Sequence, residues 1–215
     1  MKIVALSDSH NSTHEVEVLD GDVLIHAGDF SFMGKSVELD DFIGWLNKQP
    51  HKHKLWIPGN HELSLEDFSY NMEVIDNETG ATCIHNKEYE IDGIKFFGTA
   101  HTPEYGNWAF MMNEEQSKRF WEHAPEADVI VSHGPPREIL DSSTPDFPKK
   151  RLGCVSFKKY LERTKPKVAL WGHIHGSGGK TEVVKWDGGG ETFCANVAVM
   201  DEDYAVSRPV TVIEI

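Results

Sequence analysis

Seven side chains of types that commonly bind metal ions occur in five short motifs along the chain. The motifs are Asp8-Ser9-His10, Gly28-Asp29, Gly59-Asn60-His61-Glu62, Ser132-His133-Gly134 and Gly172-His173-Ile174-His175. Their carboxylate and amide oxygens and imidazole nitrogens form a mixed ligand set that suits manganese, iron, zinc or cobalt. Each motif alone would be ordinary turn chemistry. Together, in this order, they predict a two-metal hydrolase, with Asp29 as the carboxylate that bridges the metals.

Each motif directly follows a short apolar run, which is long enough for a buried strand and too short for a helix. The runs cover residues 3–6, 23–25, 55–57, 129–131 and 168–171. Because ligands in open α/β sheets bind at the carboxyl ends of strands, we expect the motifs to meet at one edge. Asp8 and His10 would point to the same face if extended geometry continued past the first strand.

The segments between these strands predict helices and antiparallel strands. Apolar residues at i, i+3, i+4 and i+7 from Leu39 indicate a helix with Ser36 as its N-cap. A second helix is expected from Asn113, with Gln116 completing a capping box. Asp92-Gly93 predicts a hairpin turn.

Further strands are expected at residues 88–91, 94–98, 181–184, 191–195 and 210–215. The predicted fold is a layered α/β/β/α sandwich, in which helices flank two mixed sheets. With 215 residues and no linker-like tract, the chain is predicted to form a single domain over residues 1–215.

The charge of the chain bears on its partners. Lys and Arg number 21 against 35 Asp and Glu, which gives a formal net charge of −14. Such a surface repels phosphate backbones, so long nucleic acid is not expected as a partner. A small phosphorylated substrate is still compatible with this charge, because bound metal ions would dominate the local field.

The expected location is the cytoplasm. Cys83, Cys154 and Cys194 are odd in number and do not form zinc-like pairs, which fits a reducing compartment. Too few apolar residues precede Asp8 for a signal peptide, and no later stretch is long and apolar enough to span a bilayer. The sequence gives no indication of the oligomeric state.

The run D-x-H, G-D, G-N-H-E, a lone His and G-H-x-H, from Asp8 to His175, resembles the calcineurin-like metallophosphoesterase superfamily. Four further stretches are similar to its MPPED branch, which is associated with cyclic-nucleotide phosphodiesterase activity. They are H-A-G-D-F at 26–30, P-E-Y-G-N-W at 103–108, H-G-P-P at 133–136 and R-L-G-C-V at 151–155. The resemblance implies a metallophosphoesterase fold.

The resemblance also implies roles for the motif residues. One metal would be held by Asp8, His10, Asp29 and His175, and the other by Asp29, Asn60, His133 and His173. His61 would be the catalytic histidine, beside the metals but not bound to them. The expected cofactors are two divalent ions, with Mn²⁺ favoured and Fe, Zn or Co as alternatives.

The chemistry of such a centre follows from its charge. Two cations about 3.5–4 Å apart lower the pKa of a bridging water and clamp the phosphoryl oxygens. The resulting hydroxide attacks the phosphorus directly, and His61 is placed to give a proton to the leaving oxygen. His26 and Glu62 are expected to orient the metal ligands through hydrogen bonds.

The expected substrate class depends on the absence of arginine beside two of these motifs. Phosphoprotein phosphatases of the superfamily carry one arginine after G-D and another before G-N-H-E, whereas Phe30 and Pro58 stand beside these motifs here. A diester carries less charge than a monoester and needs less compensation, so the sequence favours small phosphodiesters, among them 2′,3′- or 3′,5′-cyclic nucleotides. Candidate phosphate contacts are Arg137, Lys149, Lys150 and Arg151.

Two alternative functions stay open. The first is a phosphomonoesterase that acts on a small metabolite or a phosphoprotein. The second is a metal-dependent interaction module with a weak active site, against which the intact His61 and His173 argue. Trp108, Phe110 and Cys154 are candidates for shaping the pocket, although packing explains them equally well.

Overall fold

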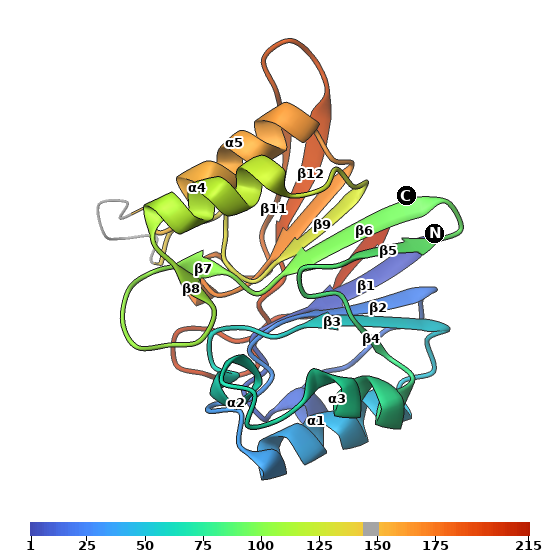
Figure 1. Cartoon of the computed structure of the whole chain (residues 1–215). Coiled ribbons are helices and arrows are strands. Elements are labelled where there is room, and N and C mark those ends of the chain that lie inside the picture. Colours follow the sequence, from blue (N-terminus) through green and yellow to red (C-terminus); the bar gives the residue numbers. More distant parts are fainter. Residues whose placement is uncertain (144–150) are drawn as a thin grey trace.

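Two β-sheets are stacked face to face between two layers of helices in the computed structural model (Figure 1). The structure describes residues 1–143 and 151–215. This is the predicted α/β/β/α arrangement. Among the described residues, no helix has the length and apolar character needed to cross a membrane.

The first sheet has the strand order β13-β1-β2-β3-β4. Strands β1 to β4 are parallel, and β13 pairs with β1 in the antiparallel direction. Every residue of β2 is buried, as expected for a parallel strand that is covered on both faces. The strands are β1 (Lys2–Leu6), β2 (Val23–Ala27), β3 (His53–Ile57), β4 (Thr82–Cys83) and β13 (Thr211–Glu214).

The second sheet has the order β11-β12-β10-β9-β6-β5. Its four central strands are parallel, and the edge strands β11 and β5 are antiparallel to their neighbours. The strands are β5 (Glu88–Ile91), β6 (Ile94–Thr99), β9 (Val129–Ser132), β10 (Val168–Trp171), β11 (Thr181–Lys185) and β12 (Glu191–Asn196). A separate short pair is formed by β7 (Thr102–Pro103) and β8 (Met111–Met112).

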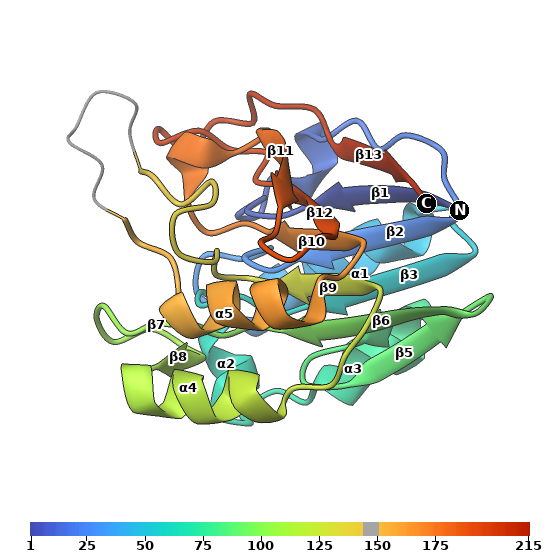
Figure 2. The same ribbon diagram turned by 90° about the horizontal axis from the view of Figure 1, so that it is seen from above.

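The helices cover the outer faces of the two sheets. Helices α1 (Ser36–Lys48) and α3 (Met72–Thr79) lie on the first sheet, whereas α4 (Glu114–His123) and α5 (Val155–Thr164) lie side by side on the second (Figures 1 and 2). Short helical turns occur at α2 (Leu63–Glu66), η1 (Thr13–Glu15) and η2 (His175–Ser177).

Three apolar layers hold this arrangement together. Ile25, Ile57 and Val131 belong to the layer between the sheets. The other two layers lie between each sheet and its helices, and they include Trp56 and Phe157. Each of these side chains is almost fully buried, which stabilises the fold by roughly 1.5–3 kcal/mol per side chain. The sheets are therefore held in fixed positions relative to one another.

The elements predicted from sequence occur with small shifts at their ends. The predicted capping box is confirmed, because Asn113 Oδ1 accepts from the Gln116 amide and Gln116 Oε1 accepts from the Asn113 amide. The predicted Ser36 cap is wrong. Ser36 is the first helical residue, and Lys35 occupies the N-cap, where its amide donates to Glu38 Oε2 at 2.8 Å.

Candidate metal centre

The five motifs lie at the carboxyl ends of β1, β2, β3, β9 and β10, where the loops of both sheets meet. The expectation of extended backbone after β1 is wrong. Asp8 and His10 have φ values of 54° and 35°, and Asp29 and His173 have 55° and 65°. Left-handed backbone at such residues costs about 1–3 kcal/mol each and is concentrated at functional sites. These sharp turns aim the side chains back over the strand ends.

Close packing around the Asp8 carboxylate requires glycine at position 172. A Cβ atom on Gly172 would overlap Asp8 Oδ2 and the Ser7 side chain. The glycine of the G-H-x-H motif thus lets the loop after β10 approach the loop after β1, and the His173 amide donates to both oxygens of Asp8 at 3.0 Å.

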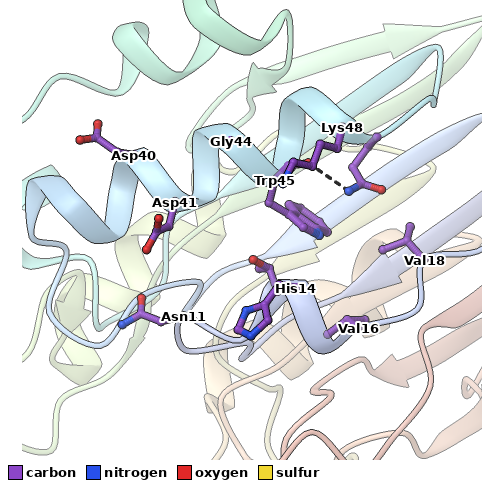
Figure 3. Close-up of a pocket in the computed structure, with 11 residues that line it drawn as sticks. Asn11, His14, Val16, Val18, Asp40, Asp41, Gly44, Trp45 and Lys48 are labelled. Atoms are coloured by element: carbon purple, nitrogen blue, oxygen red, sulfur yellow. Dashed lines mark hydrogen bonds between the residues drawn. The ribbon is translucent and has the colours of Figure 1, made fainter.

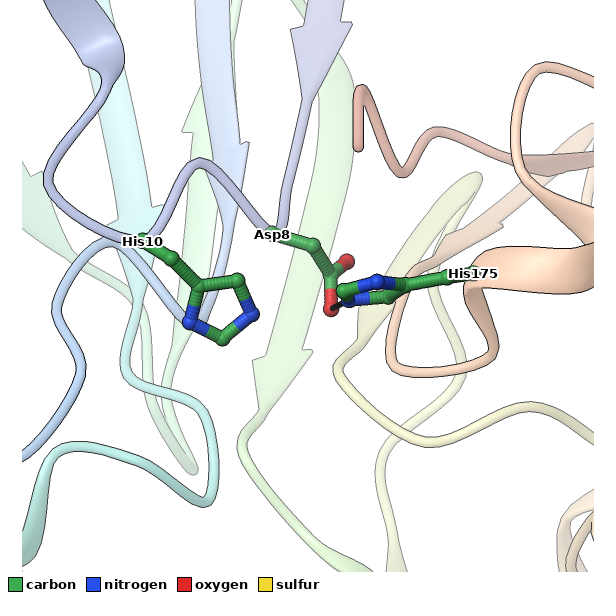
Figure 4. Close-up of side chains that lie close together, drawn as sticks. All are labelled: Asp8, His10 and His175. Atoms are coloured by element: carbon green, nitrogen blue, oxygen red, sulfur yellow. Dashed lines mark ion pairs between the residues drawn. The ribbon is translucent and has the colours of Figure 1, made fainter. Parts of the chain in front are cut away.

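His10, Asp29 and His61 form one group whose ligand atoms all lie within 4.8 Å of one another. The predicted metal ligands alone form two further groups of this kind. Asp8, His10 and His175 make up one group (Figure 4). Asp29, His133 and His173 make up the other. All of the side chains in these two further groups are buried except those of His173 and His175, which are partly exposed.

Asp29 joins the two groups. Its Oδ2 lies 3.1 Å from His133 Nε2 and 4.0 Å from His10 Nε2, and these two histidines belong to different groups. The same oxygen lies 3.9 Å from His61 Nε2. Asn60 contributes on the His133 side, where its Oδ1 is 3.1 Å from His133 Nε2. The structure therefore brings all eight predicted site residues to one edge.

The imidazole rings are oriented in the way that metal-binding histidines usually are. The Nδ1 atoms of four rings lie within hydrogen-bond distance of backbone carbonyl oxygens. A hydrogen bond at Nδ1 fixes the tautomer of the ring and leaves the Nε2 lone pair for a metal. The pairs are His10 with Ser31 (3.1 Å), His61 with Phe32 (2.8 Å), His133 with Ala27 (2.9 Å) and His175 with Asp201 (2.8 Å).

His10 Nε2 and Asn60 Nδ2 are buried at this edge and have no hydrogen-bond partner among the described residues. Leaving a buried polar atom unpaired costs about 1–3 kcal/mol, so such atoms need an explanation. A cation bound by His10 Nε2 and the carboxylates would give this imidazole nitrogen the partner that it lacks. The residues present thus fit a pair of divalent cations.

The electrostatics of the site favour ionised carboxylates. Burial opposes ionisation of Asp8 and Asp29, but the hydrogen bonds and charges of His175 and His133 outweigh it and hold both pKa values well below their usual range. Burial also opposes protonation of His133, yet the Asp29 charge raises the His133 pKa to about 9. A cation that binds between these groups replaces the His133 proton, so metal binding and protonation compete.

Burial and the positive charge of His133 lower the pKa of His173 to about 4. Its imidazole is therefore neutral at neutral pH, which is the form that binds a metal.

Glu62 ties the Asp29 loop to the Asn60 loop. Its fully buried carboxylate accepts from the amides of Gly59 (2.6 Å), Asp29 (3.0 Å) and Ser31 (2.9 Å). Burial and the charge of Asp29 raise its pKa to about 7. His26 behaves differently, because its Nε2 lies 3.0 Å from Ser9 Oγ and its ring packs among aromatic side chains.

His61 lies at the exposed side of the site, with 12% of its side chain accessible. Its ring stacks on Trp108 at a centroid distance of 4.3 Å, and its amide donates to Asp29 Oδ1 at 2.9 Å. Trp108 therefore touches the site. Phe110 instead packs against His85, and Cys154 caps α5 and lies 2.9 Å from Ser117 Oγ.

The candidate phosphate-binding cations are engaged elsewhere in the described part of the chain. Arg151 forms an ion pair with the buried Asp141 at 3.0 Å, and Arg137 donates to the Arg151 carbonyl at 2.7 Å. Lys149 and Lys150 lie outside the described residues. Within residues 1–143 and 151–215, Asp8 and Asp29 form their ion pairs with histidines.

Sequence reasoning missed an aromatic rim around the centre. The rings of Phe32, Tyr105 and Tyr204 contact His10, His173 and His175. Tyr105 lies in the 103–108 stretch singled out above, but nothing in the sequence pattern points to Phe32 or Tyr204.

A groove of about 600 Å³ beside α1 is separate from this centre (Figure 3). Asn11 and Trp45 are among the side chains that line it, and none of the candidate metal ligands does so. It has no part in the chemistry of the centre.

Comparisons with known proteins find similar sequences. The family model for calcineurin-like phosphoesterases matches residues 1–177. The human metallophosphoesterase domain-containing protein 1 is 31% identical over 240 residues, covering 100% of this chain and 71% of the human protein. A UPF0046 protein of Caenorhabditis elegans is 36% identical over 188 residues, covering 81% of this chain. The chain spans 63% of the length of that worm protein.

Solved structures show the same fold. The crystal structure of TT1561 from Thermus thermophilus superposes with a TM-score of 0.60 at 11% sequence identity, and the match covers 99% of this chain and 98% of that one. The similarity supports the two-sheet architecture described above.

Proposed function

Because the chain belongs to the calcineurin-like phosphoesterase family, we propose that it is a phosphodiesterase that acts on small diesters with two divalent metal ions, preferably Mn²⁺. The observation that carries the proposal is the position of Asp29 between the two ligand groups. One metal would be held by Asp8, His10, Asp29 and His175. The other would be held by Asp29, Asn60, His133 and His173.

Two bound divalent cations would supply a water of lowered pKa and positive charge for the phosphoryl oxygens. The residues of the chain have separate tasks. Glu62 keeps the Asp29 and Asn60 loops in register through three backbone amides. The carbonyls of Ser31, Ala27 and Asp201 fix the orientation of three metal-binding imidazoles.

His61 supplies the proton for the leaving oxygen. Its Nδ1–H is held by the Phe32 carbonyl and its ring by Trp108. Its Nε2 lies 3.9 Å from Asp29 Oδ2. In the proposed role, Nδ1–H keeps its hydrogen bond while the proton on Nε2 is given to the leaving oxygen. General acid catalysis of this kind contributes about 10²–10⁴-fold in rate.

The surrounding charges favour a diester over a monoester. Asp8 and Asp29 pair with histidines rather than with Lys or Arg in the described residues, and Arg137 and Arg151 bind other groups. A dianionic monoester needs more compensating charge than a singly charged diester. Cyclic nucleotides fit this class, and the formal charge of −14 disfavours long nucleic acid.

We also propose that the protein works in the cytoplasm. Its three cysteines are free, and those at positions 83 and 194 are buried. Free thiols of this kind fit a reducing compartment.

The experiment that tests this function compares bis(p-nitrophenyl) phosphate with p-nitrophenyl phosphate. Metal-depleted protein is assayed before and after addition of Mn²⁺. We expect hydrolysis only with metal and a higher kcat/KM for the diester. A preference for the monoester would instead establish a phosphomonoesterase. Metal binding without turnover of either ester would favour an interaction module.

A further inference from the structure

Exposed aromatic side chains gather around the metal centre. Phe32, Tyr105 and Tyr204 leave 40%, 54% and 47% of their surface accessible. Each ring nevertheless contacts the imidazole of a candidate ligand. Phe32 stacks on His10 at 5.1 Å and 24°, and Tyr105 lies 5.3 Å from His173. Large rings that are exposed together at a site point to a ligand that covers them.

Two of these rings form a pair on the Asp8 side of the centre. The centroids of Phe32 and Tyr204 are 5.8 Å apart, with an interplanar angle of 40°. Tyr204 also lies 5.0 Å from the His10 ring and 5.1 Å from the His175 ring. The pair therefore borders the group formed by Asp8, His10 and His175.

The backbone holds Tyr204 in place at a cost. Its φ of 59° is left-handed, which is unusual for a bulky residue and costs about 1–3 kcal/mol. Asp201 compensates, since its Oδ1 accepts from the amides of Asp203 and Ala205. The Asp201 carbonyl accepts from the Tyr204 amide (3.1 Å) and lies 2.8 Å from His175 Nδ1. The turn that carries Tyr204 is thus anchored to a metal-binding histidine.

Phe32 is anchored in a similar way. Its carbonyl lies 2.8 Å from His61 Nδ1, and its amide contacts Glu38 Oε1 at 3.4 Å. The main chain of Phe32 therefore positions His61, the proposed proton donor. The Phe32 ring lies against His10 at the metal centre. The Phe32 ring stacks on His10 and the Phe32 carbonyl is fixed by His61, so this exposed ring is pre-organised to meet the substrate.

We infer that Phe32 and Tyr204 form an aromatic wall that determines specificity by seating the base of a nucleoside ester arm. The inference rests on the proposed diesterase function, because the wall acts on the group that stays attached to the phosphate at this centre. Stacking of a base on an aromatic side chain contributes about 1–3 kcal/mol, or roughly 5- to 150-fold in binding. Stacking adds no charge to the site. This suits the two carboxylates of the centre, Asp8 and Asp29, whose ion pairs among the described residues are with histidines and not with arginine or lysine.

The test uses two diesters with the same leaving group. Thymidine 5′-(p-nitrophenyl phosphate) carries a base on its other arm, and methyl p-nitrophenyl phosphate does not. We expect the Mn²⁺-loaded protein to prefer the nucleoside ester. Phe32→Ala and Tyr204→Ala should each lower that preference by about fivefold or more, chiefly through KM. The readout is the ratio of kcat/KM for the two esters, measured on the same preparation of each variant, and Tyr204→Phe should retain the preference.

Phe68→Ala is the matched control, because Phe68 is 87% exposed and also has a left-handed φ of 60°. It should leave the preference intact. Metal content confirms that each variant keeps its centre. An unchanged preference in both alanine variants, or no preference in the unmodified protein, would overturn the wall.

Failure of the proposed function is distinguishable from failure of the wall. If the Mn²⁺-loaded protein hydrolyses neither diester, calorimetry compares AMP with ribose 5-phosphate as ligands. The wall predicts that AMP binds at least about fivefold more tightly, and that Phe32→Ala removes this difference. Equal affinities would overturn the wall independently of any turnover.

Discussion

The two sheets contribute different chemistry to the same centre. The loops after β1, β2 and β3 of the first sheet supply both carboxylates, the Asn60 amide and two imidazoles. The loops after β9 and β10 of the second sheet supply three imidazoles. The two groups made of predicted metal ligands draw on both sheets, since His175 joins Asp8 and His10, and His133 joins Asp29. Neither sheet alone carries either of these two groups, so both predicted metal positions depend on how the sheets are stacked. A third group, His10, Asp29 and His61, comes from loops of the first sheet.

The largest expected effect comes from the first sheet. Asp29→Ala removes the carboxylate that lies between both groups. We expect loss of metal from both positions and a loss of diester hydrolysis larger than the roughly 10²-fold expected for a proton donor. Elemental analysis and turnover check this. The exposed Asp40 on α1 provides the control variant Asp40→Ala, which should keep both metals. Retention of two metals in Asp29→Ala would refute the bridging role.

Substitution of a ligand from the second sheet should weaken metal binding at only one of the two metal positions. His173→Ala removes an imidazole from the Asp29 and His133 group. We expect the bound metal to fall from two ions to one per chain, with a correspondingly large loss of turnover. Metal content measured at several Mn²⁺ concentrations checks the prediction. Two ions bound with unchanged affinity would show that His173 is not a ligand.

A smaller effect is expected at His61, which belongs to the first sheet and for which we propose the role of proton donor. His61→Gln should lower turnover by roughly 10²-fold while both metals stay bound. The loss should shrink for aryl esters, because a good leaving group hardly needs the proton. Equal metal loss in His61→Gln and His173→Ala would make His61 a ligand and contradict the division of roles.

The smallest effect concerns stability in acid. Burial lowers the pKa of His26 in β2 to about 3, below the value near 6.5 of the unfolded chain. The unfolded state therefore takes up a proton first as pH falls below about 6.5. Stability should then decline by up to about 1.4 kcal/mol per pH unit from this group.

Denaturant unfolding of the chelated protein between pH 7.5 and 5 measures this decline. His26→Gln should flatten it, whereas His14→Gln, at an exposed position, should follow the unmodified protein. Identical slopes for all three proteins would show that His26 does not contribute.

The arrangement of the two sheets also explains which features the sequence predicts. The strand ends were predictable, because each motif directly follows an apolar run and parallel strands end at one edge. The proximity of Asp8 and Asp29 follows from that topology, because they come after the neighbouring parallel strands β1 and β2. The approach of His133 to Asp29 also requires the stacking of the two sheets. The left-handed turns at Asp8 and His10 were not predictable, since non-glycine residues take this conformation only when tertiary packing enforces it.

Other features also depend on tertiary contacts. Tyr204 reaches the centre because the Asp201 turn is held by His175, a contact between residues 26 positions apart. Helix α5 carries Phe157, Tyr160 and Leu161 at i, i+3 and i+4, a helical signal that is easily missed beside the 151–155 motif. The N-cap at Lys35 is set by the Glu38 side chain rather than by the serine that favoured the prediction.

The dependence of diester hydrolysis on bound metal tests the two-metal centre most directly. Chelated protein is titrated with Mn²⁺, and bound metal per chain and the rate with bis(p-nitrophenyl) phosphate are measured on the same samples. We predict no hydrolysis by metal-free protein and full activity at two ions per chain. Full activity of protein shown by elemental analysis to contain no metal would contradict the two-metal centre.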